Sequence, residues 1–458
     1  MTKATTLVIF GATGDLVSKK IIPSIYNLYQ SGNLPNKFKV IAFARRDFDG
    51  GKYNEVIEES LNKYGGIDSS TDLKDFFNLF TYNQGDFNNL EAYKTLKEKM
   101  VQLDNDFNEC SEKIFYLAVP PEYFNDLFNN LAQSQVTVGC VEPDRLAKIL
   151  VEKPFGKDLK TAEELDETLS RLFEEKQIYR IDHYLAKWVI DNILSFRSTN
   201  ALFEPIWNNQ HIESIEITTL ESLGVENRGG FYDPIGALRD VGQNHLLEIL
   251  ALLTMELPEN ESEESLRKNR GELLEKLKTM TEEEVIANSR RAQYKGYKDI
   301  QDVRLNSDTE TYFKVKLFLE SPRWSNVPIT IQAGKKFAHP KKEIVVNFKK
   351  VNGYNQNKII FSIEPEEKIE INFNTRISEK SEITSRRTVI KLNDSESRRQ
   401  YVEEYTQLLL DAINGDQRNF VTSQEVKAMW KFIDPIIETW QKGLVPLESY
   451  EPGAESID

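Results

Sequence analysis

The chain has 458 residues, of which 40% are hydrophobic and 29% are charged, with a formal net charge of −15. This composition is typical of a soluble globular protein with two or three domains, and the acidic balance argues against nucleic acid or an anionic membrane as the main partner. Any phosphorylated ligand therefore needs a local basic pocket. The sequence has no long apolar run and no signal-peptide pattern. Its two cysteines, Cys110 and Cys140, allow at most one disulfide, and these features together favour the cytoplasm.

The first 180 residues alternate short apolar segments with helix-period segments. Within "IIPSIYNLY", Ile21, Ile25 and Leu28 fall on one helical face, and Pro23 is a local irregularity. The predicted strands are partly β-branched and span 6–10, 39–45, 113–119 and 148–155. Strands separated by helices indicate βαβ units, so residues 1–180 are expected to form an α/β, Rossmann-like domain that binds ligands beyond the carboxyl ends of its strands.

Residues 181–458 are expected to form a second, α+β domain. Its predicted strands alternate polar and apolar residues and span 211–222, 311–320, 328–334, 343–348, 358–365 and 368–374. Consecutive strands predict a large, mainly antiparallel sheet. A charged stretch, 257–293, is interpreted as a solvated helical insert. Two helix-period segments, "SRRQYVEEYTQLLLDAI" and "SQEVKAMWKFIDPIIETW", follow the strands.

The stretch "FGATGDL" comes directly after the first predicted strand. Its Gly11 and Gly14 suit a turn whose backbone N–H groups meet a pyrophosphate at a helix N-terminus. The turn alone fits an ordinary strand–helix connection equally well. Lys20 behind it favours a nucleotide, and Arg45 and Arg46 occupy the strand end where NAD-preferring sites carry an acidic residue. Arginine there favours a 2′-phosphate and hence NADP, although a pair of surface arginines is the alternative.

Two motifs later in the chain carry clustered polar side chains. "VEKPFG" puts Lys153 at a strand end, where a lysine reaches both a cofactor and a substrate, although a helix-initiating loop is an equally good interpretation. "RIDHYLAK" supplies His183, Tyr184 and Lys187, whose cationic and hydroxyl donors suit a phosphate. Asp182 in the same motif suits the orientation of a histidine base.

The motif "RDVGQNH" contains Asp240 and His245, which lie roughly 140° apart on an ideal α-helix. Their spacing alone therefore does not bring them together. His211 and His339 lack polar surroundings and are expected to have no functional role. Without an HExxH, CxxC, calcium-loop or G-x-S-x-G pattern, we expect neither a metal site nor a serine hydrolase.

Nine motifs resemble, in the same order, those of glucose-6-phosphate dehydrogenases. They are "GATGDLVSKK", "FYLAVPP", "EKPFG", "RIDHYLAK", "FEPIWN", "RGGFYD", "RDVGQNHLLEILAL", "RWSNVPITIQAGK" and "FVTSQEVKAMWKFIDPI". The resemblance implies an enzyme of the pentose phosphate pathway that oxidises glucose 6-phosphate at C1 to 6-phosphoglucono-1,5-lactone. It further implies NADP as cofactor, with NAD as second choice, and a homodimer or homotetramer without metal.

The resemblance also implies roles for single residues. The cofactor contacts are Gly11, Ala12, Thr13, Gly14, Asp15, Leu16, Lys20, Arg45, Tyr116 and Lys153. The substrate contacts are Lys153, His183, Tyr184, Lys187, Glu221, Asp240, Lys335 and Lys341. The catalytic set is His245 as general base, Asp182 as the carboxylate that orients it, and the two lysines Lys153 and Lys187. A histidine suits a base because its ordinary pKa lies near neutrality.

Several departures from the family pattern lie near the expected sugar site. Ala186 and Trp188 replace the family's glycine and glutamate. Pro340 replaces a basic substrate residue, so that the neighbouring Lys341 is the expected substitute. Glu364 replaces a glutamine and would repel a phosphate if it lay close.

Gln332 stands where animal enzymes carry an arginine for a second, structural NADP, so we expect no such site. The departures leave two alternatives open. One is the same fold acting on a different aldose or hexose phosphate, and the other is a non-catalytic family member. The presence of both Asp182 and His245 speaks against the second alternative.

Overall fold

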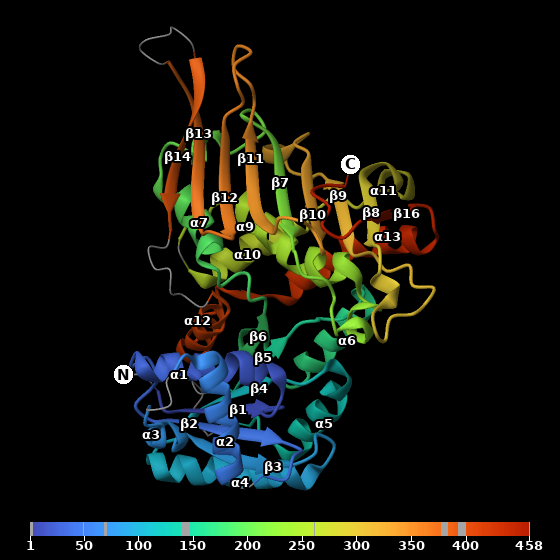
Figure 1. Ribbon diagram of the computed structural model, residues 1–458. Coiled ribbons are helices and arrows are strands. Elements are labelled where there is room, and N and C mark those ends of the chain that lie inside the picture. The colour runs from blue at the N-terminus through green and yellow to red at the C-terminus, as the bar shows by residue number, and fades with distance from the viewer. Residues whose placement is uncertain are drawn as a thin grey trace. The chain divides into compact units, whose positions relative to one another are not determined.

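The computed structural model describes residues 3–48, 50–67, 71–138, 147–260, 262–376, 383–392 and 400–457, so that Cys140 lies outside the described residues (Figure 1). The chain forms two compact units. Unit 1 comprises Met1–Gly156, Lys160–Ala186 and Ser397–Ser423, and unit 2 comprises Lys157–Leu159, Lys187–Glu396 and Gln424–Asp458. Among the described helices, none has the length and apolar character needed to cross a bilayer.

Unit 1 is built on a seven-stranded sheet in the order β15-β6-β5-β4-β1-β2-β3. Its strands are β1 (Thr5–Phe10), β2 (Phe38–Ala44), β3 (Phe80–Gln84), β4 (Glu112–Leu117), β5 (Lys148–Glu152), β6 (Ile178–Ile181) and β15 (Phe420–Val421). All neighbours are parallel except β15 and β6. This is the doubly wound order, whose topological switch point lies between β1 and β4. The predicted Rossmann-like fold is thus confirmed, although β3, β6 and β15 were not predicted.

Helices cover the parallel sheet of unit 1, which explains why every residue of β1 is buried. They are α1 (Ile22–Gln30), α2 (Gly50–Ser60), α3 (Lys74–Phe77), α4 (Leu90–Phe107), α5 (Phe124–Ser134), α6 (Leu159–Ser170) and α12 (Gln400–Asn414). The apolar face predicted for α1 is buried, and Pro23 lies in its first turn, where a missing N–H costs nothing.

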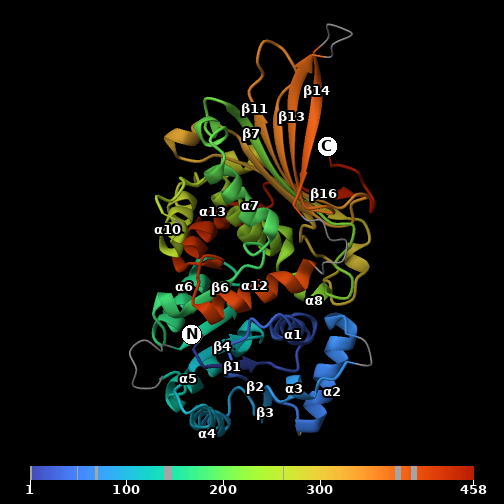
Figure 2. The same ribbon diagram turned by 90° about the vertical axis from the view of Figure 1, so that its left-hand side faces the viewer.

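Helix α12 lies beside α1 in both ribbon views, although it comes from the end of the chain (Figures 1 and 2). Leu408 and Leu409 of α12 are buried in the same apolar cluster as Ile25 of α1. The units therefore differ from the predicted division into residues 1–180 and 181–458. Unit 1 extends to Ala186 and includes α12, because the apolar face of α12 completes the core of unit 1.

Unit 2 contains a nine-stranded sheet in the order β14-β13-β12-β11-β7-β10-β9-β8-β16. Its strands are β7 (Ile212–Leu220), β8 (Ser289–Tyr294), β9 (Tyr312–Leu317), β10 (Ile329–Gly334), β11 (Lys341–Phe348), β12 (Lys358–Glu364), β13 (Lys368–Arg376), β14 (Ile383–Lys391) and β16 (Leu447–Tyr450). Only the pairs β7–β10 and β8–β16 are parallel among these described strands. The predicted, mainly antiparallel sheet is confirmed, whereas β8, β14 and β16 were not predicted.

Helices of unit 2 pack on one face of this sheet, as Figure 2 shows for α7, α10 and α13. They are α7 (Trp188–Thr199), α8 (Gly229–Tyr232), α9 (Leu247–Thr254), α10 (Glu263–Leu274), α11 (Glu282–Asn288) and α13 (Ser423–Gln441). The prediction of a solvated insert is wrong for α10, which buries Leu266 and Leu273. Its Arg270 also pairs with Glu425 of α13 at 2.6 Å, both buried. The many charged residues of α10 had hidden the apolar pattern of its buried face in the sequence.

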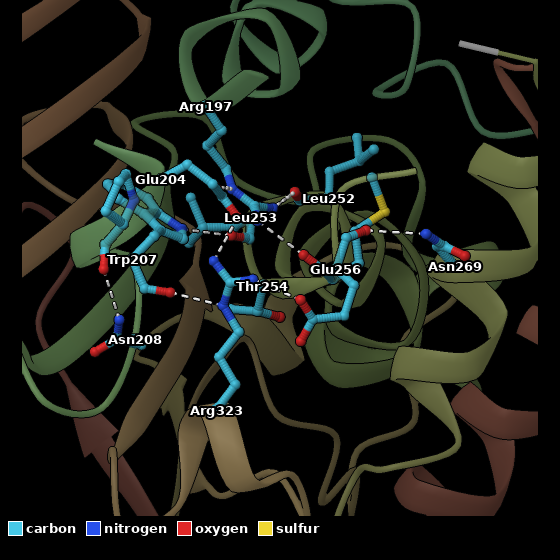
Figure 3. A network of polar contacts seen from close by, with 12 residues as sticks. Arg197, Glu204, Trp207, Asn208, Leu252, Leu253, Thr254, Glu256, Asn269 and Arg323 are labelled. Atoms are coloured by element: carbon cyan, nitrogen blue, oxygen red, sulfur yellow. Dashed lines mark hydrogen bonds and ion pairs between the residues drawn. The ribbon is translucent and has the colours of Figure 1, made fainter. Parts of the chain in front are cut away.

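A buried polar network holds α7 against the end of α9 (Figure 3). Arg197 on α7 makes two hydrogen bonds of 3.1 and 3.0 Å to Glu204. It also donates to the carbonyls of Leu252 and Met255 at 3.1 and 2.8 Å. Carbonyls at a helix end lack intrahelical partners, so the arginine satisfies them and ties the two helices together. Both helices begin next to candidate site residues, whose spacing within unit 2 this network maintains.

Candidate active site

The glycine turn of unit 1 is pressed into the switch point of the parallel sheet. Gly11 follows β1 with φ of +83°, and a Cβ placed there would lie 2.3 Å from the Ala118 carbonyl oxygen beyond β4. The N–H groups of Gly11 and Ala12 donate to the Phe43 carbonyl of β2 at 2.9 and 3.1 Å, and Gly14 N–H donates to Gly11 O at 2.8 Å. Both the backbone angle and the close approach require glycine. The turn thus lies where doubly wound sheets bind their ligands.

The chain leaves this turn through a π-helical segment, Val17–Ile21, before α1 begins. Asp15 is exposed and accepts a hydrogen bond from Lys19 at 2.7 Å, which holds the pKa of its carboxyl below the usual value. Thr13, Leu16 and Lys20 are partly buried. The lysines predicted behind the turn are therefore present, but the carboxylate of Asp15 is already paired with Lys19 one helical turn away.

Arg45 lies exposed just beyond β2, the strand next to β1. Its guanidinium carbon is 5.3 Å from the ring centre of Tyr123 and 5.8 Å from that of Phe87. Its Nη1 also donates to the Tyr123 hydroxyl at 3.4 Å. Stacking on aromatic faces orients a guanidinium that keeps further N–H donors for a phosphate.

A half-buried acid lies among the candidate residues at the ends of β4 and β5. Glu152 accepts a hydrogen bond of 2.5 Å from the Tyr116 hydroxyl. Burial raises the pKa of Glu152 to about 7, against the lowering effects of Tyr116, Lys153 and Tyr405. Burial also raises the pKa of Tyr116, which keeps its hydroxyl protonated as a donor. Sequence reasoning missed Glu152, which only its position before Lys153 at a buried strand end would have indicated.

The loop after β6 carries Asp182, His183 and Tyr184. Asp182 is 1% exposed and accepts a hydrogen bond from Tyr184 N–H at 3.0 Å, closing a local turn. The His183 ring stacks on Tyr405 of α12, with ring centres 6.1 Å apart. Tyr405 was not predicted, because no local signal connects a residue in α12 with a loop so far away in the sequence.

In unit 2, candidate residues gather at one edge of the sheet. Because β7 and β10 are parallel, Glu221 after β7 and Lys335 after β10 emerge at the same edge. Lys335 Nζ lies 2.7 Å from Glu221 Oε2 and 5.4 Å from the ring centre of Tyr232. The Glu221 N–H also donates to the Gly334 carbonyl at 2.8 Å, which holds the two chain segments together.

The next two strands bring further charges to this edge, because β11 begins there and its antiparallel neighbour β12 ends there. Lys342 and Glu364 are cross-strand partners whose charged atoms lie 2.9 Å apart. Lys342 Nζ also lies 4.0 Å from Glu221, and Glu364 lies 3.9 Å from Lys187 Nζ. The result is an alternating row of charges at the sheet edge, Lys335–Glu221–Lys342–Glu364–Lys187, which we call the charge row.

Lys341, the predicted substitute for the lost basic residue, is not in the charge row. Its side chain is 50% exposed and pairs with Glu343 at 2.7 Å. Successive side chains of a strand point to opposite faces, so Lys342 is the lysine of β11 that reaches Glu221 and Glu364. Among the other departures, Trp188 is 52% exposed at the first position of α7.

Asp240 and His245 lie on one π-helical segment, Leu238–Leu246, that runs directly into α9. Hydrogen bonds of a π-helix join residues five apart, so this spacing brings the two residues closer to one face than an α-helix would. The ideal α-helix assumed from the sequence therefore does not apply to this segment. His245 is 3% exposed, and the buried carboxyl of Glu310 accepts a hydrogen bond of 2.9 Å from Leu238 N–H at the start of the segment.

The glycine turn generates a first prediction. Gly11→Ala is expected to weaken the binding of a reduced nicotinamide cofactor at least about tenfold, because the new methyl group meets the Ala118 carbonyl and pushes the turn out of place. Gly32→Ala is the matched control, since Gly32 also has a positive φ but nothing within 4 Å of an added Cβ. Fluorescence titration with NADPH measures both affinities. Equal affinities of the two variants would contradict the close-packed turn.

Glu152 generates a second prediction, because its pKa is raised from 4.5 to about 7 in the folded chain. Such a carboxyl stabilises the fold fully below the unfolded pKa, and this stability is lost as the pH rises through about 7. The free energy of unfolding of the wild type, relative to Glu152→Gln, should therefore fall by about 3 kcal/mol between pH 4.5 and 7.5.

Urea unfolding across this pH range measures the difference in free energy of unfolding between wild type and Glu152→Gln. Contributions from other titrating groups such as Asp411 are the same in both proteins and cancel in this difference. Glu91→Gln, which removes an exposed surface carboxylate, serves as control for the loss of a charge. A difference between wild type and Glu152→Gln that does not change with pH would show that folding leaves the pKa of Glu152 unshifted.

Comparison with known proteins agrees with this geometry. The family model "Glucose-6-phosphate dehydrogenase, NAD binding domain" matches residues 8–192, and "Glucose-6-phosphate dehydrogenase, C-terminal domain" matches residues 194–457. The glucose-6-phosphate 1-dehydrogenase of Bacillus subtilis is 35% identical over 472 residues, covering 98% of this chain and 94% of the relative. That of Borreliella burgdorferi is 36% identical over 453 residues, covering 95% and 91%.

Solved structures show the same relationship. A glucose-6-phosphate dehydrogenase in complex with its substrate glucose 6-phosphate superimposes with a TM-score of 0.89 at 31% identity, covering 100% of this chain and 96% of the other. A glucose-6-phosphate 1-dehydrogenase from Mycobacterium avium gives a TM-score of 0.84 at 28% identity, covering 98% and 95%. Sequence and fold therefore agree, and this chain belongs to the glucose-6-phosphate dehydrogenase family.

Proposed function

We propose that the protein oxidises glucose 6-phosphate at C1 to 6-phosphoglucono-1,5-lactone and transfers the hydride to NADP. Family membership supports this reaction, since the curated relatives carry the name glucose-6-phosphate 1-dehydrogenase. The observation that carries the proposal is the charge row together with Asp240 and His245 on the π-helical segment. The charge row provides three lysines against two glutamates in a chain of net charge −15, and its two carboxylates are acceptors suited to sugar hydroxyls.

We assign the proton transfer to His245, which accepts the proton of the C1 hydroxyl. Asp182 is the carboxylate that orients this histidine and stabilises the imidazolium that forms. Lys187 binds the remote phosphate with His183 and Tyr184, and this binding energy orients C1 toward the base.

The sugar hydroxyls are assigned to the residues at the edge of the unit 2 sheet and on the π-helical segment. Glu221 and Asp240 accept their hydrogen bonds, and Lys335 donates to the sugar. Glu221 is already paired with Lys335 at 2.7 Å, which holds the carboxylate in a fixed orientation. This arrangement favours a polyhydroxylated ring over an apolar substrate.

The cofactor site is assigned to the turn from Gly11 to Leu16 with Lys20, and to Arg45, Tyr116 and Lys153. The positive φ and close packing of Gly11 shape a tight turn at the strand end where doubly wound sheets bind a pyrophosphate. When bound, NADP supplies the hydride acceptor. Arg45 holds the 2′-phosphate, which favours NADP over NAD, and Lys153 positions the substrate beside the cofactor.

We further propose a cytoplasmic homodimer or homotetramer. A plant relative, the "Glucose-6-phosphate 1-dehydrogenase, cytoplasmic isoform" of Solanum tuberosum, is 32% identical and covers 98% of this chain. On β13 and β14, Phe373, Val389 and Ile390 are 46%, 40% and 44% exposed, which leaves apolar surface for assembly.

His245→Ala tests the proposed reaction. Turnover is expected to fall at least about 1,000-fold, because no other group takes the C1 proton, while the dissociation constant for glucose 6-phosphate changes less than about threefold. His211→Ala, which removes an exposed histidine beside β7, is the control and should keep wild-type turnover. Steady-state rates and calorimetric binding measure the two effects. Wild-type turnover in His245→Ala would remove this residue from its role.

Arg45→Ala tests the cofactor preference. Loss of a charge-assisted contact with the 2′-phosphate should raise the KM for NADP about 10- to 100-fold and leave the KM for NAD within about threefold. Arg46→Ala is the matched control and should change this ratio less, because only Arg45 is assigned to the 2′-phosphate. Initial rates with each cofactor at saturating glucose 6-phosphate give the four constants. A parallel rise for both cofactors would place Arg45 away from the 2′-phosphate.

A further inference from the structure

Glu364 lies between two buried lysines at the end of β12. Its carboxylate is 2.9 Å from Lys342 Nζ and 3.9 Å from Lys187 Nζ. The side chains of Lys187 and Lys342 are 1% and 6% exposed, and that of Glu364 is 18% exposed. All three charges are therefore largely removed from water, where charge interactions are strong.

A lone carboxylate next to Lys187 would be harmful to phosphate binding. It would neutralise the ammonium group and repel the phosphate dianion that this lysine is proposed to bind. Lys342 changes this balance, because it is the nearer cation and donates a hydrogen bond of 2.9 Å to Glu364. Lys187, Glu364 and Lys342 together carry a net charge of one positive unit, so that an anion remains attracted.

The fold holds Lys342 in this position from two sides. Lys342 and Glu364 are direct cross-strand partners in the β11–β12 ladder. On the other side, Lys342 Nζ lies 4.0 Å from Glu221, which is itself paired with Lys335. A lysine between two carboxylates has little freedom to leave, and a buried carboxylate without it would be costly.

We propose that Lys342 is a positioning residue for the phosphate subsite, which holds the charge of Glu364 away from Lys187. This role rests on the proposed function, in which Lys187 binds the substrate phosphate. Lys342 and Glu364 act as one unit, so the effect of losing the lysine depends on the presence of the glutamate. The pair explains how this chain accommodates a carboxylate close to a phosphate-binding lysine.

Kinetics of Lys342→Met test the proposal, since methionine keeps most of the apolar stem. The KM for glucose 6-phosphate and the inhibition constant of inorganic phosphate should both rise about 10- to 100-fold, whereas kcat changes less than about threefold. In Lys342→Met with Glu364→Gln, both constants should return to within about threefold of wild type. Glu364→Gln alone should not raise them. Additive effects in the double variant, or a rise in Glu364→Gln as large as in Lys342→Met, would overturn the proposal.

Three further variants separate this proposal from others. Lys358→Met removes a lysine from the opposite end of β12 and should leave both constants unchanged. Lys341→Met compares the neighbouring lysine, and a larger effect there than at Lys342 would contradict the assignment. Lys187→Met tests the proposed phosphate contact itself. If Lys187→Met leaves the KM unchanged, the function assigned to Lys187 is wrong. If Lys187→Met raises the KM but Lys342→Met does not, only the role proposed for Lys342 is wrong.

Lys342→Arg keeps the test valid if Lys342→Met does not fold. Arginine retains the positive charge, so the KM of Lys342→Arg should stay within about threefold of wild type. The KM of Lys342→Met with Glu364→Gln should also stay within about threefold. A tenfold rise in either one would contradict the proposal. Thermal midpoints of all variants show whether a kinetic change comes from a damaged fold.

Discussion

The alternation of lysine and glutamate along one sheet edge is the constraint on which the site of unit 2 depends. Each carboxylate of the charge row has a lysine on both sides, from Lys335 at one end to Lys187 at the other. Buried charges are stable only when they are paired, so the row fixes where each side chain lies. The row contains three lysines and two glutamates, and so carries one net positive charge in an otherwise acidic protein.

The site also depends on unusual backbone geometry at two places, the turn at Gly11 and the π-helical segment Leu238–Leu246. Gly11 allows the first turn to approach the switch point of the parallel sheet. The π-helical segment brings Asp240 and His245 closer to one face, and its Gly242 packs so closely on Phe313 of β9 that a Cβ would lie 2.7 Å from the ring. π-helical segments are rare and occur often at functional sites, in agreement with this placement.

Local patterns in the sequence predicted most strands of both sheets, because alternation and β-branched runs are properties of neighbouring residues. Long-range packing was not predictable in this way. The position of α12 in unit 1, the buried face of α10 and the contact of Tyr405 with His183 all join distant segments. Likewise, the sequence indicated that Glu364 would repel a phosphate if it lay close. The lysine that neutralises this carboxylate, Lys342, can be identified only from the register of β11 and β12.

The measurement that tests the central claim most directly is the formation of reduced cofactor by the purified wild-type chain. Glucose 6-phosphate, unphosphorylated glucose and other hexose and aldose phosphates are compared with NADP and with NAD. The account predicts the highest kcat/KM for glucose 6-phosphate with NADP, and a large loss when the phosphate is removed from the sugar. A higher kcat/KM for another sugar phosphate, or no reduced cofactor with any of them, would contradict it.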